Sequence, residues 1–483
     1  MTRRREFFRV HAVKRTYNKA TGTFTFNISY QTTPAQRTPR TQTVAEAFGL
    51  GNDQTQQFTL YDNTNIHIRP TDIVLITGES GSGKSALLKA LKTDLGSQAA
   101  DTKTHPTNPD APIIETLGET TSQALNLLSK AGLNDAFLFL RTYSQLSDGQ
   151  KHRYHIAKLA ETPAQFWLLD EFTSTLDRDT AKIVAYNLQR TARTQGKAVI
   201  AATTHNDIKT DLAPNVHIHK HYGKQLTITY HPKAHIQQCT LTKKTTIQPG
   251  TLQDYKALSN FHYRTAHATA PRKIFTLKRK NELIGAIIYT YPPPFCFGRS
   301  KAWKGNLQQL QREVSLISRV VIHPKYRGIG LGEKLVRETL PQCGTPCVEA
   351  VAVMAKINPF FEHAGMQPIA ESHPSKPVAQ TLQTLEELGF EPALLPNVAY
   401  VENRINQVGA QKITALLLQL SQKDGAARKR LATARNPFPK HEEVAAKIQN
   451  QTPSQLAQTL KRLSFLAQSK LYLFWRKPEE TLN

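Results

Sequence analysis

The sequence lacks any hydrophobic run long enough to cross a bilayer, which takes about 20 apolar residues. Its 483 residues include only four cysteines, too scattered for a disulfide framework. The N-terminal segment 1–6 carries three arginines and no apolar stretch of the kind found in signal peptides. These absences argue against a membrane-spanning protein and a disulfide-stabilised secreted protein, so we expect a cytoplasmic protein with no membrane partner.

Acidic residues are also few. Asp and Glu number 37 against 62 Lys and Arg, which gives a formal net charge of +25. The excess lies in three windows, 1–40, 263–325 and 421–483, and the middle window alone holds 12 basic and 2 acidic residues. Basic surfaces gain affinity for phosphates by releasing counterions, so a polyanionic partner is expected. The alternative is that these are solvated faces that keep the protein soluble.

The length exceeds what one hydrophobic core usually serves, so we expect several domains. Residues 1–43 predict a basic N-terminal arm or hairpin. Residues 44–240 and 245–400 each alternate strand-like with helical runs, the pattern of an α/β fold. Residues 401–483 are rich in Leu, Ala, Gln, Lys and Arg and predict a basic helical C-terminal region.

A glycine-rich turn connects a strand-like run, 72–77, to a helical run that begins after residue 85. It has the spacing of a P-loop, in which backbone N–H groups and a helix N-terminus surround phosphates. Lys84 would neutralise the β- and γ-phosphates of ATP, and Ser85 would hold Mg²⁺. The residues predicted to bind nucleotide here are Gly78, Ser80, Gly81, Gly83, Lys84 and Ser85.

A second apolar run, 166–169, ends in Asp170 and Glu171. Asp170 would anchor Mg²⁺, and Glu171 would polarise the attacking water. The run 146–150 opens a helix between the two motifs, and 174–177 and His205 follow them. Five elements in this order resemble the ABC-type ATPases. The resemblance assigns the signature motif to Ser147, Gly149 and Gln150, the end of the D-loop to Asp177, and the switch histidine to His205.

In the ABC family, ATP is sandwiched between two cassettes, so the single cassette of this chain implies a homodimer that closes on ATP. Two positions depart from the family pattern. Asp148 stands where glycine is usual, and Phe172 follows Glu171 where proline is common. No Q-loop glutamine can be placed between Ser85 and Leu146. No membrane segment is fused to the cassette. The family resemblance is therefore compatible with two kinds of ABC protein, a soluble regulator or a transporter ATPase with a separate permease.

A second glycine-rich turn, 327–332, follows the strand-like run 316–324 and fits the pattern R-x-x-G-x-G. Such a turn could serve a dinucleotide fold, with Glu349 near the distance at which that fold places an acid. The runs 348–354 and 358–366 instead resemble the second half of a GNAT-type acetyltransferase. The resemblance implies an acyl-CoA site with a strand amide among 318–320 on the thioester carbonyl. The residues assigned to acetyl-CoA are Val320, Arg327, Gly328, Gly330, Gly332 and Asn358.

The catalytic groups of the acetyltransferase are less clear from the sequence. The tyrosine that often serves as the acid in this family aligns with Phe361. Glu349 and Glu313 are candidate bases and His363 is a candidate acid, although each could instead be structural or solvent-exposed. An α/β chain with an ABC-type P-loop ATPase domain, a GNAT acyltransferase domain and a basic helical C-terminal region resembles ATPase–acetyltransferase fusions of prokaryotes. Its acetyltransferase half is more loosely similar to Mom-like DNA-modification enzymes of phages.

These features predict an ATP-dependent N-acetyltransferase that uses ATP, Mg²⁺ and acetyl-CoA and acts on RNA or DNA. Basic and aromatic residues of the 263–325 window would contact phosphates and stack on bases. They are Arg264, Arg272, Lys273, Lys278, Arg279 and Lys280, with Tyr263, Phe275, Tyr289 and Tyr291. One alternative is a nucleic-acid-binding ATPase whose acyl-CoA site is a sensor without turnover, and another is a protein N-acetyltransferase.

Overall fold

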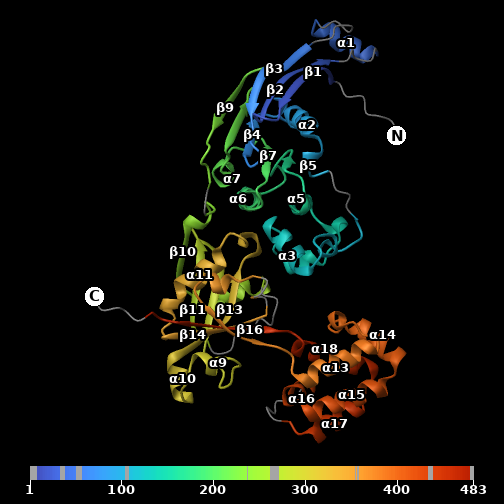
Figure 1. Cartoon of the computed structure of the whole chain (residues 1–483), viewed down its shortest axis with the longest axis vertical. Coiled ribbons are helices and arrows are strands. Elements are labelled where there is room, and N and C mark those ends of the chain that lie inside the picture. Colours follow the sequence, from blue (N-terminus) through green and yellow to red (C-terminus); the bar gives the residue numbers. More distant parts are fainter. Residues whose placement is uncertain are drawn as a thin grey trace, which may run out of the picture. The chain divides into compact units, whose positions relative to one another are not determined.

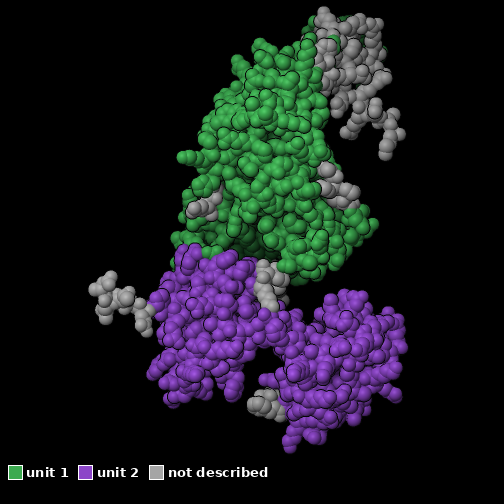
Figure 2. All heavy atoms as spheres, viewed as in Figure 1, with its two compact units in different colours: residues 1–267, 275–286, 320–335 green, residues 268–274, 287–319, 336–483 purple. Residues whose placement is uncertain are grey.

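The computed structural model describes residues 8–32, 38–49, 57–103, 108–235, 238–261, 271–353, 355, 358–432 and 439–478. The chain forms two compact units, shown in two colours in Figure 2. The first comprises residues 1–267, 275–286 and 320–335, and the second comprises 268–274, 287–319 and 336–483. The acetyltransferase segment therefore contributes to both units. In the part of the chain that is described, no helix is long and apolar enough to cross a membrane.

The N-terminal part of the first unit is a three-stranded antiparallel sheet in the order β1-β2-β3. Its strands are β1 (Phe8–Asn18), β2 (Thr23–Thr32) and β3 (Gln57–His67), with helix α1 (Pro39–Ala47) between β2 and β3. Apolar residues alternate along β2, and Phe24, Phe26 and Ile28 are all buried. The alternation places one face of this sheet against the ATPase core.

The centre of the first unit is a six-stranded sheet in the order β5-β6-β7-β4-β8-β9. Neighbouring strands are parallel except for the antiparallel β8–β9 pair. The strands are β4 (Ile73–Gly78), β5 (Ala99–Asp101), β6 (Phe166–Leu169), β7 (Ala198–Ala202), β8 (Val216–Lys220) and β9 (Leu226–Tyr230). Strands β4, β6 and β7 are buried along their whole length, as expected for a sheet covered on both faces.

Helices cover this sheet from both sides, as Figure 1 shows. One core includes α2 (Lys84–Leu95) together with β1–β3, and the other includes α5 (Asp148–Glu161) and α6 (Arg178–Gln195). The remaining α-helices of this part are α3 (Thr121–Lys130), α4 (Ala136–Phe139), α7 (Lys209–Leu212) and α8 (Leu252–Leu258).

The acetyltransferase segment forms a seven-stranded sheet in the order β10-β11-β12-β13-β14-β16-β15. Its strands are β10 (Thr245–Pro249), β11 (Pro271–Arg279), β12 (Glu282–Thr290), β13 (Val314–Ile322), β14 (Cys347–Ala352), β15 (Gln367–Ser372) and β16 (Lys470–Arg476). Four short α-helices accompany the sheet: α9 (Arg299–Ala302), α10 (Leu307–Glu313), α11 (Leu331–Thr339) and α12 (Phe360–His363). Strands β13 and β14 are parallel, whereas β16 is antiparallel to both of its neighbours.

In the described part of the segment between β15 and β16, six α-helices enclose a hydrophobic core of their own. They are α13 (Lys376–Glu387), α14 (Val398–Val408), α15 (Ala410–Lys423), α16 (Gly425–Ala432), α17 (His441–Gln449) and α18 (Pro453–Leu463). These helices are drawn in orange and red in Figure 1. The bundle is thus an insertion into the acetyltransferase sheet.

The predicted helical C-terminal region is confirmed, but its bounds differ from the prediction. The helices begin at Lys376, within the segment 245–400 that we assigned to the acetyltransferase, and the region 401–483 is not helical throughout. Residues 470–476 return as β16 and pair with β14 and β15. The run Leu471–Trp475 is apolar and aromatic, a strand signal within an otherwise helical composition.

Candidate active sites

The first candidate site surrounds the turn between β4 and α2. Gly78, Gly81 and Gly83 have φ values of 146°, 79° and 102°, which residues with a side chain rarely adopt. Lys84 Nζ donates hydrogen bonds to the carbonyl oxygens of Gly78 (2.8 Å) and Glu79 (2.7 Å), so the loop curls around the ammonium group. Desolvation lowers the pKa of Lys84, although the charge of Asp170 opposes the shift. The turn therefore has the backbone geometry of a phosphate-binding loop, and the Lys84 ammonium group lies within it.

The two carboxylates predicted to act with this loop lie directly after β6. Ser85 Oγ donates a hydrogen bond to Asp170 Oδ1 at 2.9 Å, so the two predicted Mg²⁺ ligands are adjacent. Glu171 is exposed and has a φ of 50°, an uncommon backbone conformation for this residue. A hydroxyl and a carboxylate oxygen beside a phosphate cradle suit hydrated Mg²⁺. The donor set therefore fits a magnesium–nucleotide complex.

The signature residues open helix α5. Ser147 and Gln150 form a capping box in which Ser147 N donates to Gln150 Oε1 at 3.0 Å. A Cβ at Gly149 would lie 3.1 Å from Leu176 Cδ2 and 3.2 Å from Thr175 O. Glycine therefore allows α5 to approach the turn that precedes Asp177.

Asp177 and His205 lie on the loops that follow β6 and β7. Asp177 is the N-cap of α6 and accepts hydrogen bonds from Thr180 N (3.2 Å) and Thr180 Oγ1 (2.5 Å). His205 is half-buried, and its backbone N donates to Thr203 Oγ1 at 3.1 Å. Because β4, β6 and β7 are parallel, the loops after all three strands lie at the same edge of the sheet. The structure thus brings Lys84, Glu171 and His205 to one edge.

The second candidate site is on β13. The parallel pairs with β14 run from Val314 with Cys347 to Ile317 with Ala350, and β13 then continues to Ile322 beyond the last pair. Residues 318–320 therefore lie on the part of β13 that follows its last pair with β14. A backbone N–H group on this part of the strand could donate to a thioester carbonyl, the role predicted for Val320.

The glycine turn follows β13 through a 3₁₀ helix, Pro324–Tyr326. Gly328 and Gly330 have φ values of 82° and 83°, and α11 begins at Leu331, so the turn opens a helix as the motif requires. The guanidinium group of Arg327 donates to the carbonyl oxygens of Ile322 (2.8 Å), Phe261 (2.9 Å) and Asn134 (2.6 Å). The side chain of Arg327 therefore stabilises the conformation of the turn.

Glu349 does not have the environment of a general base. It is completely buried, and Oε1 accepts a hydrogen bond from Arg299 Nη2 at 2.6 Å. Oε2 accepts hydrogen bonds from Arg299 Nε and from the Tyr472 hydroxyl, each at 2.9 Å. A buried carboxylate whose two oxygens are held by an arginine and a tyrosine joins the elements that carry them, and it is shielded from solvent. The sequence could not indicate this, since Arg299 and Tyr472 are distant from Glu349 along the chain.

The other two catalytic candidates, Glu313 and His363, lie on different helices, α10 and α12. Glu313 accepts hydrogen bonds from Arg312 Nη2 (2.8 Å) and Trp303 Nε1 (3.2 Å), which lower its pKa and weaken it as a base. His363 and Asn358 are exposed. Phe361 is buried against Phe360, with ring centroids 4.2 Å apart.

Two of the aromatic residues predicted to stack on bases cannot do so in this structure. Phe275 and Tyr289 are buried, and the Tyr289 hydroxyl is 2.8 Å from Thr339 Oγ1. Consecutive residues on both faces of their strands are buried as well, which explains the error. Tyr263 and Arg264 lie outside the described residues. Tyr291 remains 48% exposed, with the Arg272 guanidinium 4.9 Å from its ring centre.

The sequence analysis missed one exposed aromatic residue near Tyr291. Phe295 is 90% exposed on the loop that follows three consecutive prolines. The loop is anchored on both sides of Phe295. Arg299 Nη1 donates to Pro294 O at 3.0 Å, and Phe297 packs edge-to-face against Tyr472 with ring centroids 5.9 Å apart.

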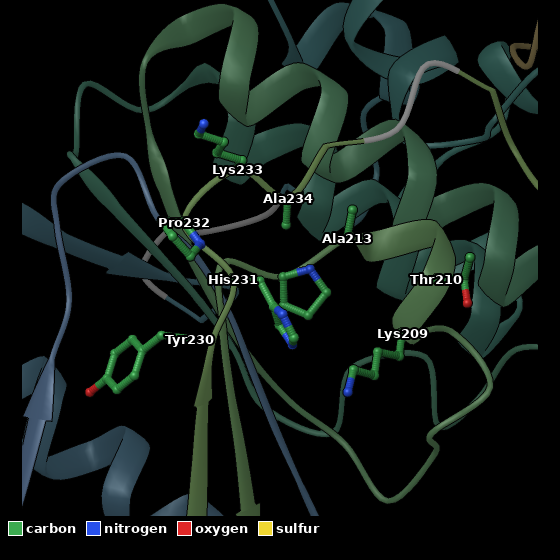
Figure 3. Close-up of a pocket in the computed structure, with 9 residues that line it drawn as sticks. Lys209, Thr210, Ala213, Tyr230, His231, Pro232, Lys233 and Ala234 are labelled. Carbon is green, nitrogen blue, oxygen red and sulfur yellow. The ribbon is translucent and has the colours of Figure 1, made fainter.

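A depression of about 610 Å³ lies beside β9 on the first unit. It is lined by basic and aromatic side chains, including Lys209, Tyr230, His231 and Lys233 (Figure 3). None of its lining residues belongs to the motifs above, and we assign it no role in either site. Within the described ranges, no group of three or more His, Cys, Asp or Glu side chains could hold a metal ion.

Both candidate sites lie in segments that match known protein families. Residues 54–103 match the family model described as the P-loop containing region of AAA domain, and residues 240–364 match that of the Acetyltransferase (GNAT) family. The lipoprotein-releasing system ATP-binding protein LolD of Novosphingobium aromaticivorans is 30% identical over 181 residues, which cover 30% of this chain and 80% of LolD. The chain belongs to the ABC-type ATPases and carries a GNAT acetyltransferase domain. It is accordingly an enzyme of both classes.

Other relatives of this ATPase–acetyltransferase match the ATPase part. The cytochrome c biogenesis ATP-binding export protein CcmA of Xanthomonas oryzae is 27% identical over 172 residues, 29% of this chain and 77% of CcmA. The methionine import ATP-binding protein MetN of Streptomyces coelicolor is 27% identical over 198 residues, 32% of this chain and 55% of MetN. Among solved structures, a dimeric bacterial ABC transporter cassette aligns with a TM-score of 0.30 and 19% identity over 36% of this chain and 91% of that one.

Proposed function

We propose that this protein is an ATP-dependent N-acetyltransferase that transfers an acetyl group from acetyl-CoA to an amine of RNA or DNA. The observation that carries the proposal is that one chain contains both the phosphate-binding turn at Lys84 and a second glycine turn, 327–332, between strand β13 and helix α11. The four cysteines are free thiols, which supports a reducing compartment such as the cytoplasm.

At the ATPase site, Lys84 and the backbone of the glycine turn would hold the phosphates of ATP. Ser85 and Asp170 would hold hydrated Mg²⁺, which neutralises phosphate charge when bound. Glu171 would orient the water that attacks the γ-phosphate, with His205 on the neighbouring loop. Ser147, Gly149 and Gln150 open a helix N-terminus that would complete the site of a second copy. We therefore propose a homodimer that closes on ATP and clamps the nucleic acid.

At the acetyltransferase site, the backbone of residues 327–332 would hold the pyrophosphate of acetyl-CoA. Val320 N–H would hold the thioester carbonyl oxygen, so that the acceptor amine attacks a carbon already polarised. Positioning would supply most of the rate enhancement. Phe361 occupies the position of the usual acid, and Glu349 is already paired. Another group or a water molecule would therefore accept the proton of the acceptor amine, and another donor would protonate the departing thiolate.

The basic and aromatic surface of the second unit supports nucleic acid as the acceptor. Tyr291 and Phe295 are exposed, and Arg272 lies over the Tyr291 ring. Lys301 and Lys304 are exposed on the following segment. Aromatic rings stack on unpaired bases of any sequence, while lysine and arginine contact phosphates.

The test is incubation of the purified protein with ATP, Mg²⁺ and radiolabelled acetyl-CoA together with RNA, DNA or cellular protein. We expect label in nucleic acid, and a fall of about tenfold or more when Lys84→Ala removes the charge-assisted contacts to phosphate. Lys89→Ala, an exposed lysine on the same helix, is the matched control.

Each alternative predicts a different result in this experiment. Label in polypeptide alone would indicate a protein N-acetyltransferase. Tight binding of acetyl-CoA without any labelled macromolecule would favour a sensor without turnover, which the buried Phe361 makes the second candidate. Transfer to nucleic acid that does not respond to ATP or to Lys84→Ala would contradict the ATP dependence.

A further inference from the structure

Two aspartates of the ATPase segment pair with basic residues of the acetyltransferase segment within the first unit. Lys325 Nζ lies 2.8 Å from Asp177 Oδ1 and 3.7 Å from Asp179 Oδ2. Arg279 holds Asp179 with two hydrogen bonds, from Nη1 at 2.6 Å and from Nη2 at 3.0 Å. These contacts join the D-loop end of the ATPase to the segment that leads into the acetyl-CoA turn.

The aspartates are close in sequence to the ATPase catalytic carboxylates. Asp177 follows Asp170 by seven positions, and the connecting turn contains two non-glycine residues with positive φ, Glu171 at 50° and Thr173 at 64°. Such conformations cost free energy and persist only where surrounding contacts enforce them. The group that would face the γ-phosphate and the group that pairs with Lys325 thus lie on one strained turn.

Lys325 and its neighbours begin the acetyl-CoA turn. The Tyr326 hydroxyl donates to Glu282 Oε2 at 2.8 Å, and Arg279 Nη1 lies 3.3 Å from the same hydroxyl oxygen. The Tyr326 side chain is buried, so this cluster fixes the chain immediately before Arg327.

The next residues of the same turn, Arg327 and Gly328, also contact the ATPase segment. Arg327 Nη1 donates to Asn134 O at 2.6 Å, and Asn134 Nδ2 donates to Arg327 O at 3.3 Å. A Cβ at Gly328 would lie 3.4 Å from Asn187 Nδ2 and 3.5 Å from Asn134 Nδ2. The turn is therefore held between two parts of the ATPase.

The electrostatics agree with this geometry. Burial acts to raise the pKa of Asp177, but hydrogen bonds from Lys325 and Thr180 outweigh it and lower the pKa to about 2. The side chain of Asp177 is 56% exposed and that of Lys325 is 30% exposed, so the pair can separate without burying a charge. A partly exposed ion pair of this kind can stabilise the position of the turn while it is formed, and the turn can move when it breaks.

We propose that Asp177 and Asp179 are positioning residues of the acetyltransferase, which set the acetyl-CoA turn through Lys325 and Arg279. Acetyl-CoA affinity then depends on the nucleotide bound at the ATPase site. Because coupling between two binding sites is reciprocal, nucleotide affinity must depend on acetyl-CoA by the same factor. This inference rests on the proposed function, because it requires that both ligands bind.

The test measures a full thermodynamic cycle on the full-length protein by isothermal titration calorimetry. Acetyl-CoA is titrated into protein that is free of nucleotide or saturated with Mg²⁺ and a non-hydrolysable ATP analogue. The analogue is then titrated with and without saturating acetyl-CoA. We expect both affinities to change by the same factor, about fivefold or more.

Variants locate the coupling in the ion pair. We expect Lys325→Met to reduce the coupling factor towards one, whereas Lys325→Arg, which keeps the charge, retains it. Lys256→Met, an exposed lysine on α8, is the matched control and keeps the wild-type factor. Circular dichroism and thermal melting establish that each variant is folded, and the wild-type cycle requires no variant.

The outcomes separate the two proposals. If wild-type protein binds no acetyl-CoA, the proposed function fails. If it binds acetyl-CoA with the same affinity at every nucleotide state, this inference is wrong and the proposed function stands. Coupling that survives Lys325→Met in a folded protein would also overturn the assignment to Asp177 and Asp179.

Discussion

The guanidinium group of Arg299 meets the carboxylate of Glu349 inside the second unit, where Nη2 lies 2.6 Å from Oε1 and Nε lies 2.9 Å from Oε2. The Tyr472 hydroxyl, from the C-terminal strand β16, donates to the same carboxylate. Burial and the adjacent carboxylate raise the pKa of Tyr472, so it remains a donor. The network joins α9, β14 and β16 next to the last β13–β14 pair, and it fixes the strand that borders the acyl site.

Arg299→Ala should destabilise the protein strongly, because it leaves the Glu349 charge buried without a partner. We expect a loss of about 3 kcal/mol in the free energy of unfolding, measured by urea denaturation. Arg312→Ala, which breaks the exposed pair with Glu313, should leave the free energy of unfolding nearly unchanged, because solvent screens an exposed pair. If Glu349 were a general base, Glu349→Gln would leave stability intact and abolish acetyl transfer selectively, which is the opposite of our expectation.

Gly78→Ala should abolish nucleotide binding. A Cβ at this position would lie 2.2 Å from Lys220 O, and the φ of 146° is itself unfavourable for alanine. We expect a destabilisation of about 2 kcal/mol or more and no measurable binding of a fluorescent ATP analogue. Gly425→Ala is the control, since nothing lies within 4 Å of its Cβ. Wild-type affinity in Gly78→Ala would show that the loop can rearrange.

The sequence predicted both glycine turns because each is a contiguous motif with its own backbone requirement. Gly78 to Ser85 and Arg327 to Gly332 both lie between a strand and a helix, as their spacing indicates. The role of Glu349 could not be predicted, since its partners come from distant segments. The position of β16 in the sheet could not be predicted for the same reason, because its pairing with β14 joins residues more than 100 positions apart.

Acid should destabilise the ATPase domain through His152, which lies on the signature helix α5. Burial, together with the nearby His155 and Arg153, lowers the pKa of His152 to about 4. Its Nε2 is 3.5 Å from Thr173 N, in the turn after Glu171. Between pH 6.5 and 4, the unfolded chain takes up a proton at this residue and the folded protein does not. Stability is therefore lost as the pH falls through this range.

The expected loss is about 2 kcal/mol between pH 7 and pH 5. Urea unfolding at a series of pH values measures it. His152→Gln, which cannot titrate, should show a smaller loss over the same range. His373→Gln, an exposed histidine of the acetyltransferase part, serves as the control and should follow the wild-type curve. Equal pH dependence in His152→Gln and wild type would contradict the assignment.

Phe295→Ala should weaken binding of single-stranded RNA or DNA without affecting folding. Removing a stacked ring costs about 1–3 kcal/mol per base, so we expect affinity to fall about tenfold at constant salt. Phe295 is 90% exposed, and its loop is anchored through Arg299 and Phe297, so the thermal stability should not change. Phe48→Ala, an exposed phenylalanine of the first unit, is the matched control. Fluorescence anisotropy with labelled single strands and duplexes measures the effect. An equal loss of affinity in Phe295→Ala and Phe48→Ala would place the contact with nucleic acid elsewhere. A loss confined to duplexes would do the same, because only an unpaired base offers its face to a single aromatic side chain.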